Sequence, residues 1–461
     1  MAGRARSDVN LLRLAELLQE HITPALCHAA FGRVRKTERQ RAWTLTALVQ
    51  FWVAVILRAP KALSQALADG LEMREPLIPR VPATPEAFFQ RCRDLRAAFF
   101  VEVFERFTAR VLTGVPPRYA AEMAEVQARF PALVVLDGSR LAAIARRLKL
   151  LWDERAVVLP GCLLGVYDLG RGLCRALVFD ADAAASELKR AVAALDRLAR
   201  DTLVLGDRLY CTAAFFEALH EHGCWGVVRR NTQLGLRKLQ RLRKRRVQGS
   251  GLEDWLVRAG SGVSAPAQTL RYVRWRRGRT RYEVLTNVLT PARLSAEEAL
   301  DLYPYRWGIE RMFFDLKEVL NLNRVYAANP NAVAMQVYAA AIVYNGMRVA
   351  QSEAAAQLGW PPERISPAKF FPKLAVACHL HLQEQQWARQ FHRRGPRTHP
   401  QLIHRRRPWA HTANTTIDVE RRSESRRHRR YCPARRHWKS LAHVRGGRRF
   451  LAKLLIRAQN V

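Results

Sequence analysis

The chain has 461 residues, of which 49% are hydrophobic and 25% charged, so it can build a sizeable core and two to four domains. This composition excludes an intrinsically disordered chain. Lysine and arginine number 77 against 40 aspartates and glutamates, which gives a formal net charge of +37 at pH 7. An excess of this size is typical of proteins that bind a polyanion, and nucleic acid is the expected partner.

Membrane insertion and disulfide bonding are not expected. The most apolar run, residues 44–57, is too short for a membrane span and contains Thr and Gln, which suits a buried helix. The amino terminus has no apolar signal region, and the eight cysteines are scattered without a CxxC pair. We therefore predict a cytoplasmic protein with reduced cysteines and no zinc site of the CxxC type.

Residues 1–125 predict an all-helical domain. Helical patterns cover residues 8–30, 39–72 and 84–113, and basic side chains are spread through them. A helical bundle can place one helix in a DNA major groove, so DNA binding is one interpretation. An ordinary bundle with a basic surface is the other, and no recognition helix stands out.

Residues 126–228 alternate short apolar strands with helices. The predicted order is strand, strand, strand, helix, strand, helix, strand, over residues 133–136, 161–168, 172–179, 185–200, 202–206, 212–222 and 224–228. This α/β order is that of a ribonuclease-H-like mixed sheet. Asp137 and Asp207 each follow an apolar strand directly, at the strand ends where α/β sheets usually keep ligands. Taken singly, Asp137 also suits a turn and Asp207 a helix cap.

A basic insertion follows over residues 229–294. Between residues 229 and 248 there are nine lysines or arginines and no acidic residue. Strands are predicted at 269–277 and 280–289, on either side of a glycine turn at Gly278. We therefore expect a basic, β-rich insertion in the sheet.

The core is predicted to resume over residues 295–385 and to be followed by a basic tail, residues 386–461. Apolar helical patterns at 330–352 and 367–383 suit helices that cover the sheet. The tail is rich in arginine, with interspersed Pro, Gly, Ser and His, and cannot build a core. We expect it to become ordered only on phosphates.

The segment that opens this second part predicts two abutting helices. Ser295 and Glu298 form a capping-box pattern, and Pro304 fits the first turn of a second helix better than a helix interior. Tyr303 would lie at the joint. Large apolar side chains fill most of the second helix, so we expect it to be largely buried.

One polar stripe runs along this helix. At about 100° per residue, Arg306, Glu310 and Lys317 fall close together, with Tyr303 near the edge. Two interpretations are open. In the first, Arg306 and Glu310 form an ordinary ion pair while Lys317 reaches water. In the second, the Glu310 carboxylate binds a cation, and Arg306 and Lys317 on either side of it hold phosphates.

The spacing of these four residues, Y-x2-R-x3-E-x6-K, together with the text RWGIE, resembles the signature helix of bacterial insertion-sequence transposases of the DDE class, insertion sequence four type. LVVLDGS, which contains Asp137, is similar to the first aspartate motif of that family. LVLGDRLY, which contains Asp207, is similar to the second. Leu209 departs from the small residue that is frequent at its position.

The resemblance implies a Mg²⁺-dependent DNA transposase with a ribonuclease-H-like core. Such an enzyme binds the inverted terminal ends of its insertion sequence, cleaves DNA by phosphodiester hydrolysis and joins the 3′ ends to target DNA. Two Mg²⁺ ions, for which Mn²⁺ substitutes, suit oxygen ligands and an in-line displacement. The implied catalytic and metal-binding residues are Asp137, Asp207 and Glu310, and the implied DNA-binding residues are Tyr303, Arg306 and Lys317. A homodimer on DNA, associated with the bacterial nucleoid, is expected.

Other functions and roles stay open. The chain could be a catalytically idle, transposase-derived DNA-binding protein, or a structure-selective nuclease of the same fold. Within the insertion, Trp275 is a candidate to stack on a displaced base, as in the family. Its alternative role is a cross-strand aromatic pair with Tyr282.

Overall fold

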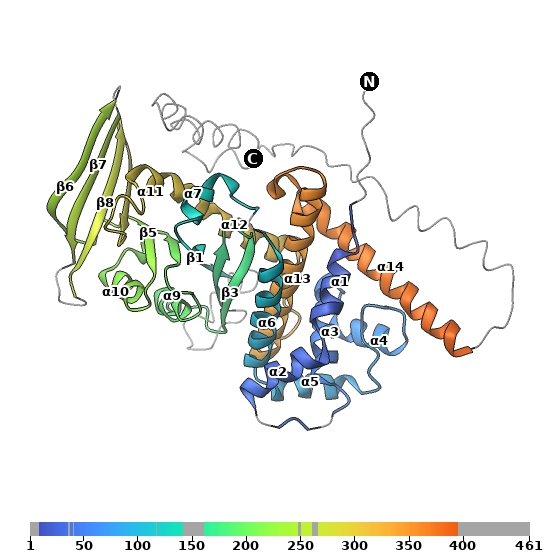
Figure 1. The fold of residues 1–461 in the computed structure, drawn as a ribbon. Helices are drawn as coiled ribbons and strands as arrows, with labels where there is room; N and C mark the ends of the chain where they lie inside the picture. Colours follow the sequence, from blue (N-terminus) through green and yellow to red (C-terminus); the bar gives the residue numbers. More distant parts are fainter. Residues whose placement is uncertain are drawn as a thin grey trace, which may run out of the picture.

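The computed structural model describes residues 9–394, apart from residues 36, 40, 117, 142–160, 248–249 and 261–265. A large mixed sheet lies beside a group of helices that includes the first and last helices described (Figure 1). This confirms the predicted mixed α/β architecture. Of the predicted tail, only the residues up to Arg394 are described, and they end a helix.

The sheet has nine strands in the order β3-β2-β1-β4-β5-β9-β8-β7-β6. β1 pairs with β4, and β4 with β5, in parallel, and the remaining neighbours are antiparallel. The predicted succession of strands and helices up to residue 229 is confirmed. The strand bounds are Leu133–Arg140 (β1), Cys162–Asp168 (β2), Leu173–Asp180 (β3), Leu203–Gly206 (β4), Trp225–Arg229 (β5), Leu236–Val247 (β6), Ser250–Ala259 (β7), Gln268–Arg277 (β8) and Thr280–Thr286 (β9).

The α-helices lie around the core part of this sheet and make up the group of helices beside it, here called the helical region (Figure 1). Their bounds are Arg13–His21 (α1), Pro24–Val34 (α2), Leu45–Arg58 (α3), Leu63–Leu71 (α4), Pro85–Asp94 (α5), Ala98–Gly114 (α6), Ala124–Gln127 (α7), Glu187–Leu195 (α9), Ala213–Glu221 (α10), Ala296–Leu302 (α11), Trp307–Phe314 (α12), Pro330–Gln357 (α13) and Pro367–Arg394 (α14). Among the described residues, no single helix is long and apolar enough to cross a membrane.

Each helical pattern predicted before residue 125 is two helices. Pro24 begins α2 behind the cap of Thr23, because a proline in a helix interior would remove a hydrogen bond and clash with the preceding turn. Ala59, at φ 46°, ends α3 in the left-handed region. α1, α3, α5 and α6 pack against α13, and one apolar cluster contains side chains from α1, α3, α6 and α13. The helical region therefore shares its core with the rest of the chain.

Alternation along β1 assigns its side chains to two faces of the sheet. Val134 and Leu136 join the apolar cluster beneath α9 and α10, whereas Leu133 and Val135 join the cluster that includes α12 and α13. Successive strand side chains point to opposite faces, so Asp137 belongs to the face that α12 covers. The prediction that this strand ends at residue 136 is wrong, because pairing with β2 continues it to Arg140.

The insertion extends the core sheet. β8 and β9 confirm the two predicted strands, and β9 pairs with β5, so β6 to β9 continue the same sheet. β6 and β7 were not predicted. β6 carries seven lysines and arginines and forms the outermost strand, so its sequence lacks the apolar pattern of a buried strand.

A buried ion pair holds two strands of the insertion together. Arg271 of β8 is fully buried and contacts Asp254 of β7, with 2.6 Å between Nη2 and Oδ2. Its Nη1 donates to the carbonyl oxygens of Val288 and Leu294, at 3.1 and 2.7 Å. A buried charge is tolerated when it is paired and hydrogen-bonded in this way. The pair therefore links the insertion to the chain that leads into α11.

Candidate functional site

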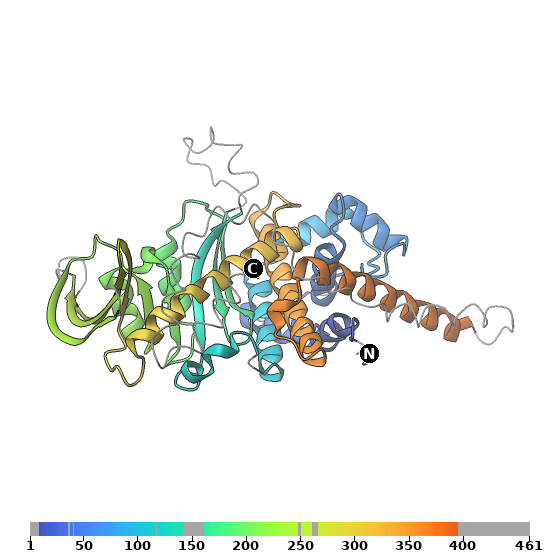
Figure 2. The same ribbon diagram turned by 90° about the horizontal axis from the view of Figure 1, so that it is seen from above.

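The segment that carries the polar stripe runs across the sheet as a bent helical rod (Figure 2). The predicted capping box is present, since Ser295 Oγ accepts from Glu298 N at 3.1 Å and Glu298 Oε2 accepts from Ser295 N at 2.8 Å. A 3₁₀ turn, Tyr303–Arg306, joins α11 to α12 around Pro304. The predicted joint at Tyr303 is confirmed.

The rod ends in a π turn, Asp315–Val319, which the sequence did not predict. A π turn adds one residue to a helical turn and rotates everything that follows it. Lys317 lies within this turn and, like Arg306, contacts β1. Its Nζ donates to Ser139 Oγ at 2.7 Å and to the carbonyl oxygen of Arg140 at 2.6 Å. The interpretation that Lys317 reaches water is wrong.

The rod is less buried than its composition predicts. Trp307 and Phe314 are 52% and 47% exposed, whereas Ile309, Met312 and Leu316 are fully buried. α12 lies on one face of the sheet, so its opposite side faces solvent. Predicting a largely buried helix was wrong for the two aromatic side chains.

Arg306 joins two of the predicted metal ligands. Its Nη1 lies 2.7 Å from Asp137 Oδ2, and its Nη2 lies 2.8 Å from Glu310 Oε1. Burial would lower the pKa of Arg306, but Tyr303, Asp137 and Glu310 outweigh that effect and raise it. The Arg306–Glu310 ion pair, one of the two interpretations, is present. No pattern in the sequence indicated that Arg306 would also pair with Asp137. Residues more than 160 positions apart thus share one guanidinium.

Asp207 directly follows β4, the strand that neighbours β1. β1 and β4 are parallel with Val135 opposite Leu205, and Asp137 and Asp207 each come two residues later. Asp207 also raises the pKa of Asp137, so the two carboxyl groups are neighbours. Adjacent strands are about 4.8 Å apart. Asp207 follows β4 in extended backbone and caps a 3₁₀ turn, Arg208–Tyr210, where its Oδ1 accepts from Leu209 N. The alternative that Asp207 caps the helix at Thr212 is therefore wrong, because Thr212 itself caps α10.

Several opposing effects act on the pKa of the Asp137 carboxyl group. Burial raises its pKa to about 6; Arg306 and the Gly138 amide oppose this rise, while Glu187 and Asp207 add to it. Glu187, at the start of α9, accepts from the Tyr210 hydroxyl at 2.6 Å. No sequence signal pointed to Glu187, because nothing but the fold brings α9 to β1. The neighbourhood of Asp137 therefore contains four acidic residues: Asp137 itself, Glu187, Asp207 and Glu310.

Tyr303 belongs to the same neighbourhood. Burial raises the pKa of its hydroxyl, Arg306 and Arg229 oppose this rise, and Asp207 adds to it. Arg229, at the end of β5, was not predicted as a site residue. Leu209 is 46% exposed, so its departure from the family pattern needs no space in the core.

Trp275 is not available for base stacking. It is 5% exposed, and its ring lies 5.6 Å from that of Tyr282, its direct partner across β8 and β9. The alternative role, a cross-strand aromatic pair, is confirmed.

The donor chemistry of the site suits a hard divalent cation, since its candidate ligands are carboxylate oxygens. Within the described ranges, however, no group of three or more His, Cys, Asp or Glu side chains is arranged to hold a metal ion. Arg306 lies between Asp137 and Glu310 and offsets their charge. Metal binding by Asp137, Asp207 and Glu310 therefore stays a prediction.

Asp137 should make stability depend on pH in metal-free buffer. Below a pH of about 4 its carboxyl is protonated in both the folded and the unfolded chain. Between about pH 4 and 6 only the folded chain keeps the proton, so wild type should lose stability relative to Asp137→Asn as pH rises. Above about 6 the difference should be constant. Thermal unfolding across pH 4–7 measures it, and a pH-independent difference would contradict the raised pKa.

Comparison with known proteins gives the class of the domain. Residues 163–345 match the family model described as "Transposase DDE domain". The matched segment contains Asp207, Glu310 and the whole polar stripe, and it begins after Asp137. It supports a DDE-type transposase.

A particular relative agrees with this class. The chain is 29% identical over 148 residues to "Putative transposase y4zB" of Sinorhizobium fredii (strain NBRC 101917 / NGR234), over 31% of this chain and 41% of that protein. The chain thus spans about two fifths of the length of this relative. Among solved structures, the piggyBac transposase synaptic complex with hairpin DNA has a TM-score of 0.39 at 8% identity, covering 87% of this chain and 86% of that one. A likeness this loose carries no conclusion.

Proposed function

We propose that this chain is a DNA transposase of the insertion-sequence-four type, which cuts DNA at the inverted ends of its element and joins the 3′ ends to target DNA. One observation carries the proposal: Arg306 binds both Asp137 and Glu310, and Asp207 directly follows β4, the strand that pairs in parallel with β1. The sheet order β3-β2-β1-β4-β5 supports a ribonuclease-H-like core. Pairing of two DNA ends calls for at least a homodimer.

Asp137, Asp207 and Glu310 are the residues that would hold Mg²⁺, or Mn²⁺ in its place. When bound, the ions supply Lewis acidity at the phosphodiester and at the attacking and leaving oxygens. Glu187 and Tyr210 lie near these carboxylates, on the other face of β1. The Tyr210 hydroxyl donates to Glu187 and so fixes the position of this carboxylate.

The cationic residues would bind and orient the DNA backbone. Arg306 is held by two carboxylates, so its guanidinium is fixed in orientation, and arginine suits bidentate phosphate contacts. Lys317 is anchored beside Asp137 by Ser139, two residues further along β1. Tyr303 lies at the joint between the two helices. These three side chains would align a strand across the carboxylates.

The insertion adds a surface suited to duplex DNA. Most side chains of β6 are exposed, among them the basic residues Arg237, Lys238, Arg241, Arg243 and Lys244. Basic side chains on an outer strand match the charge of a phosphate backbone. This surface would contribute affinity without reading sequence.

The direct test uses purified full chain and duplex DNA that carries the inverted ends of the element bordering its gene. Nicks at the element ends are expected with Mg²⁺ or Mn²⁺ and not with EDTA, followed by joining of 3′ ends to target DNA. End binding without nicking in either metal would favour the idle DNA-binding protein. Cutting that ignores the terminal sequence would favour the structure-selective nuclease.

Salt should weaken binding steeply. Each phosphate contact releases counterions, so a plot of log K against log salt falls with a slope of about −0.9 per contact on duplex DNA. With several contacts from the basic surfaces, we expect a slope steeper than about −4, measured by fluorescence anisotropy from 50 to 300 mM salt. An affinity insensitive to salt would rule out phosphate contacts as its source.

A further inference from the structure

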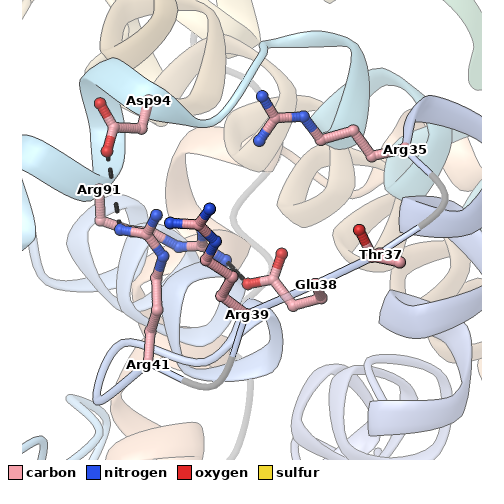
Figure 3. Close-up of a pocket in the computed structure, with 7 residues that line it drawn as sticks. All are labelled: Arg35, Thr37, Glu38, Arg39, Arg41, Arg91 and Asp94. Atoms are coloured by element: carbon pink, nitrogen blue, oxygen red, sulfur yellow. Dashed lines mark hydrogen bonds and ion pairs between the residues drawn. The ribbon is translucent and has the colours of Figure 1, made fainter.

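A second basic site lies in the helical region, on elements that contribute nothing to the carboxylate site. Described residues between α2 and α3, together with residues of α5, line an open pocket of about 470 Å³. Figure 3 shows the guanidinium groups of Arg39, Arg41 and Arg91 gathered together, with Arg35 reaching toward the same space from across the cavity. The lining residues are Arg35, Thr37, Glu38, Arg39, Arg41, Arg91 and Asp94.

The two acids of this arginine pocket are already engaged. Arg91, 4% exposed, binds Glu38 through Nη2. Asp94 Oδ2 lies 3.6 Å from Arg41 Nη1, and its Oδ1 accepts from Gln90 at 2.7 Å. Within the part of the chain that the structure describes, neither Arg35 nor Arg39 has an ion-pair partner, and Nε of Arg91 is buried without a hydrogen-bond acceptor. The pocket therefore carries surplus positive charge.

The surplus charge identifies the chemistry of a ligand. Like charges held together repel one another, and an anion with several oxygens removes this cost while it engages the guanidinium groups in pairs. None of the described lining residues has an apolar or aromatic side chain to hold a base, a sugar or a carbon chain. The pocket therefore suits the charged oxygens of an anion such as phosphate. Arg35, Arg39 and Arg41 are exposed, so phosphates on a large ligand can reach them.

We propose that the arginine pocket binds phosphates of a DNA backbone, as an anchoring contact separate from the carboxylate site. The identity of the ligand as DNA rests on the proposed function. Backbone contacts position DNA but carry no sequence information. The pocket should therefore strengthen binding to every duplex by the same factor and leave the chemical step unchanged.

The test compares Arg35→Gln/Arg39→Gln with the control Arg110→Gln/Arg364→Gln in the full chain. The control removes the same charge from exposed arginines outside the pocket. Loss of two phosphate contacts should reduce the salt slope by about 2 and weaken binding about ten- to a hundredfold at 0.1 M salt. End-containing and unrelated duplexes should be affected equally, and cleavage at saturating DNA should be unchanged. The control should change affinity less than about threefold.

Several results would overturn the proposal. One is a pocket variant that keeps wild-type affinity and salt slope, or a control that loses as much affinity. Another is inorganic triphosphate that binds wild type and not the pocket variant, while both bind duplex equally, since the ligand would then be a free polyphosphate. A wild-type chain that binds no duplex would overturn the proposed function as well. Wild type that binds and cuts DNA, with a pocket variant like the control, would overturn the pocket alone.

Discussion

Replacing Asp137 by asparagine is expected to lower Mg²⁺-dependent cleavage at least about a thousandfold. The change removes one anionic ligand and leaves Arg306 paired with Glu310 alone. A loss of about 4 kcal/mol of transition-state stabilisation corresponds to a thousandfold in rate, because each 1.36 kcal/mol is a factor of ten. Single-turnover cleavage of an end-containing duplex, with DNA saturating, measures the effect.

The control for this prediction is Asp196→Asn, which removes an exposed carboxylate that pairs with His222 outside the site. It should cleave within about twofold of wild type. Glu310→Gln should behave like Asp137→Asn, and both should retain DNA binding. Cleavage by Asp137→Asn at the rate of the control would remove Asp137 from the site.

Arg271→Met should be the most destabilising single change in the insertion. It would leave Asp254 buried and unpaired and deprive two carbonyl groups of their donor, and breaking a buried pair costs about 3–5 kcal/mol. Arg274→Met is the matched control on the same strand. Arg274 pairs with Glu253 of β7 but is 27% exposed, so its loss should cost about 1 kcal/mol or less.

Urea unfolding followed by tryptophan fluorescence would compare the two variants. Adding Asp254→Leu to Arg271→Met should restore part of the lost stability, because the stranded charge is then removed. Equal destabilisation by the two arginine variants would contradict the assigned difference between a buried and a partly exposed pair.

The succession of strands and helices along the chain and the two aspartates were predictable from sequence, because each depends on a local pattern. Apolar runs of four to eight residues mark buried strands wherever the chain places them, and Asp137 and Asp207 follow two of these runs directly. The stripe of Arg306 and Glu310 depends on helical periodicity within one turn. None of these features depends on how distant segments of the chain contact one another.

The missed features are those that depend on distant segments. The second carboxylate of Arg306, the approach of Glu187 to β1 and the pairing of β9 with β5 each join parts of the chain far apart in sequence. The π turn after α12 was invisible for a different reason, since its residues are ordinary helix formers and its extra residue comes from packing. β6 was missed because charge replaced the apolar alternation.

The outermost position of β6 has a consequence for how copies of the protein meet in solution. An edge strand can template the growth of a sheet from one molecule to the next. Here two irregularities, at Leu239 and Leu242, break the even pairing of β6 with β7, and closely spaced cations along it would repel an identical strand. A bound polyanion such as DNA would neutralise this repulsion. The irregular pairing of β6 would then be left to oppose sheet growth, so the purified protein should aggregate most readily when DNA is present in substoichiometric amounts.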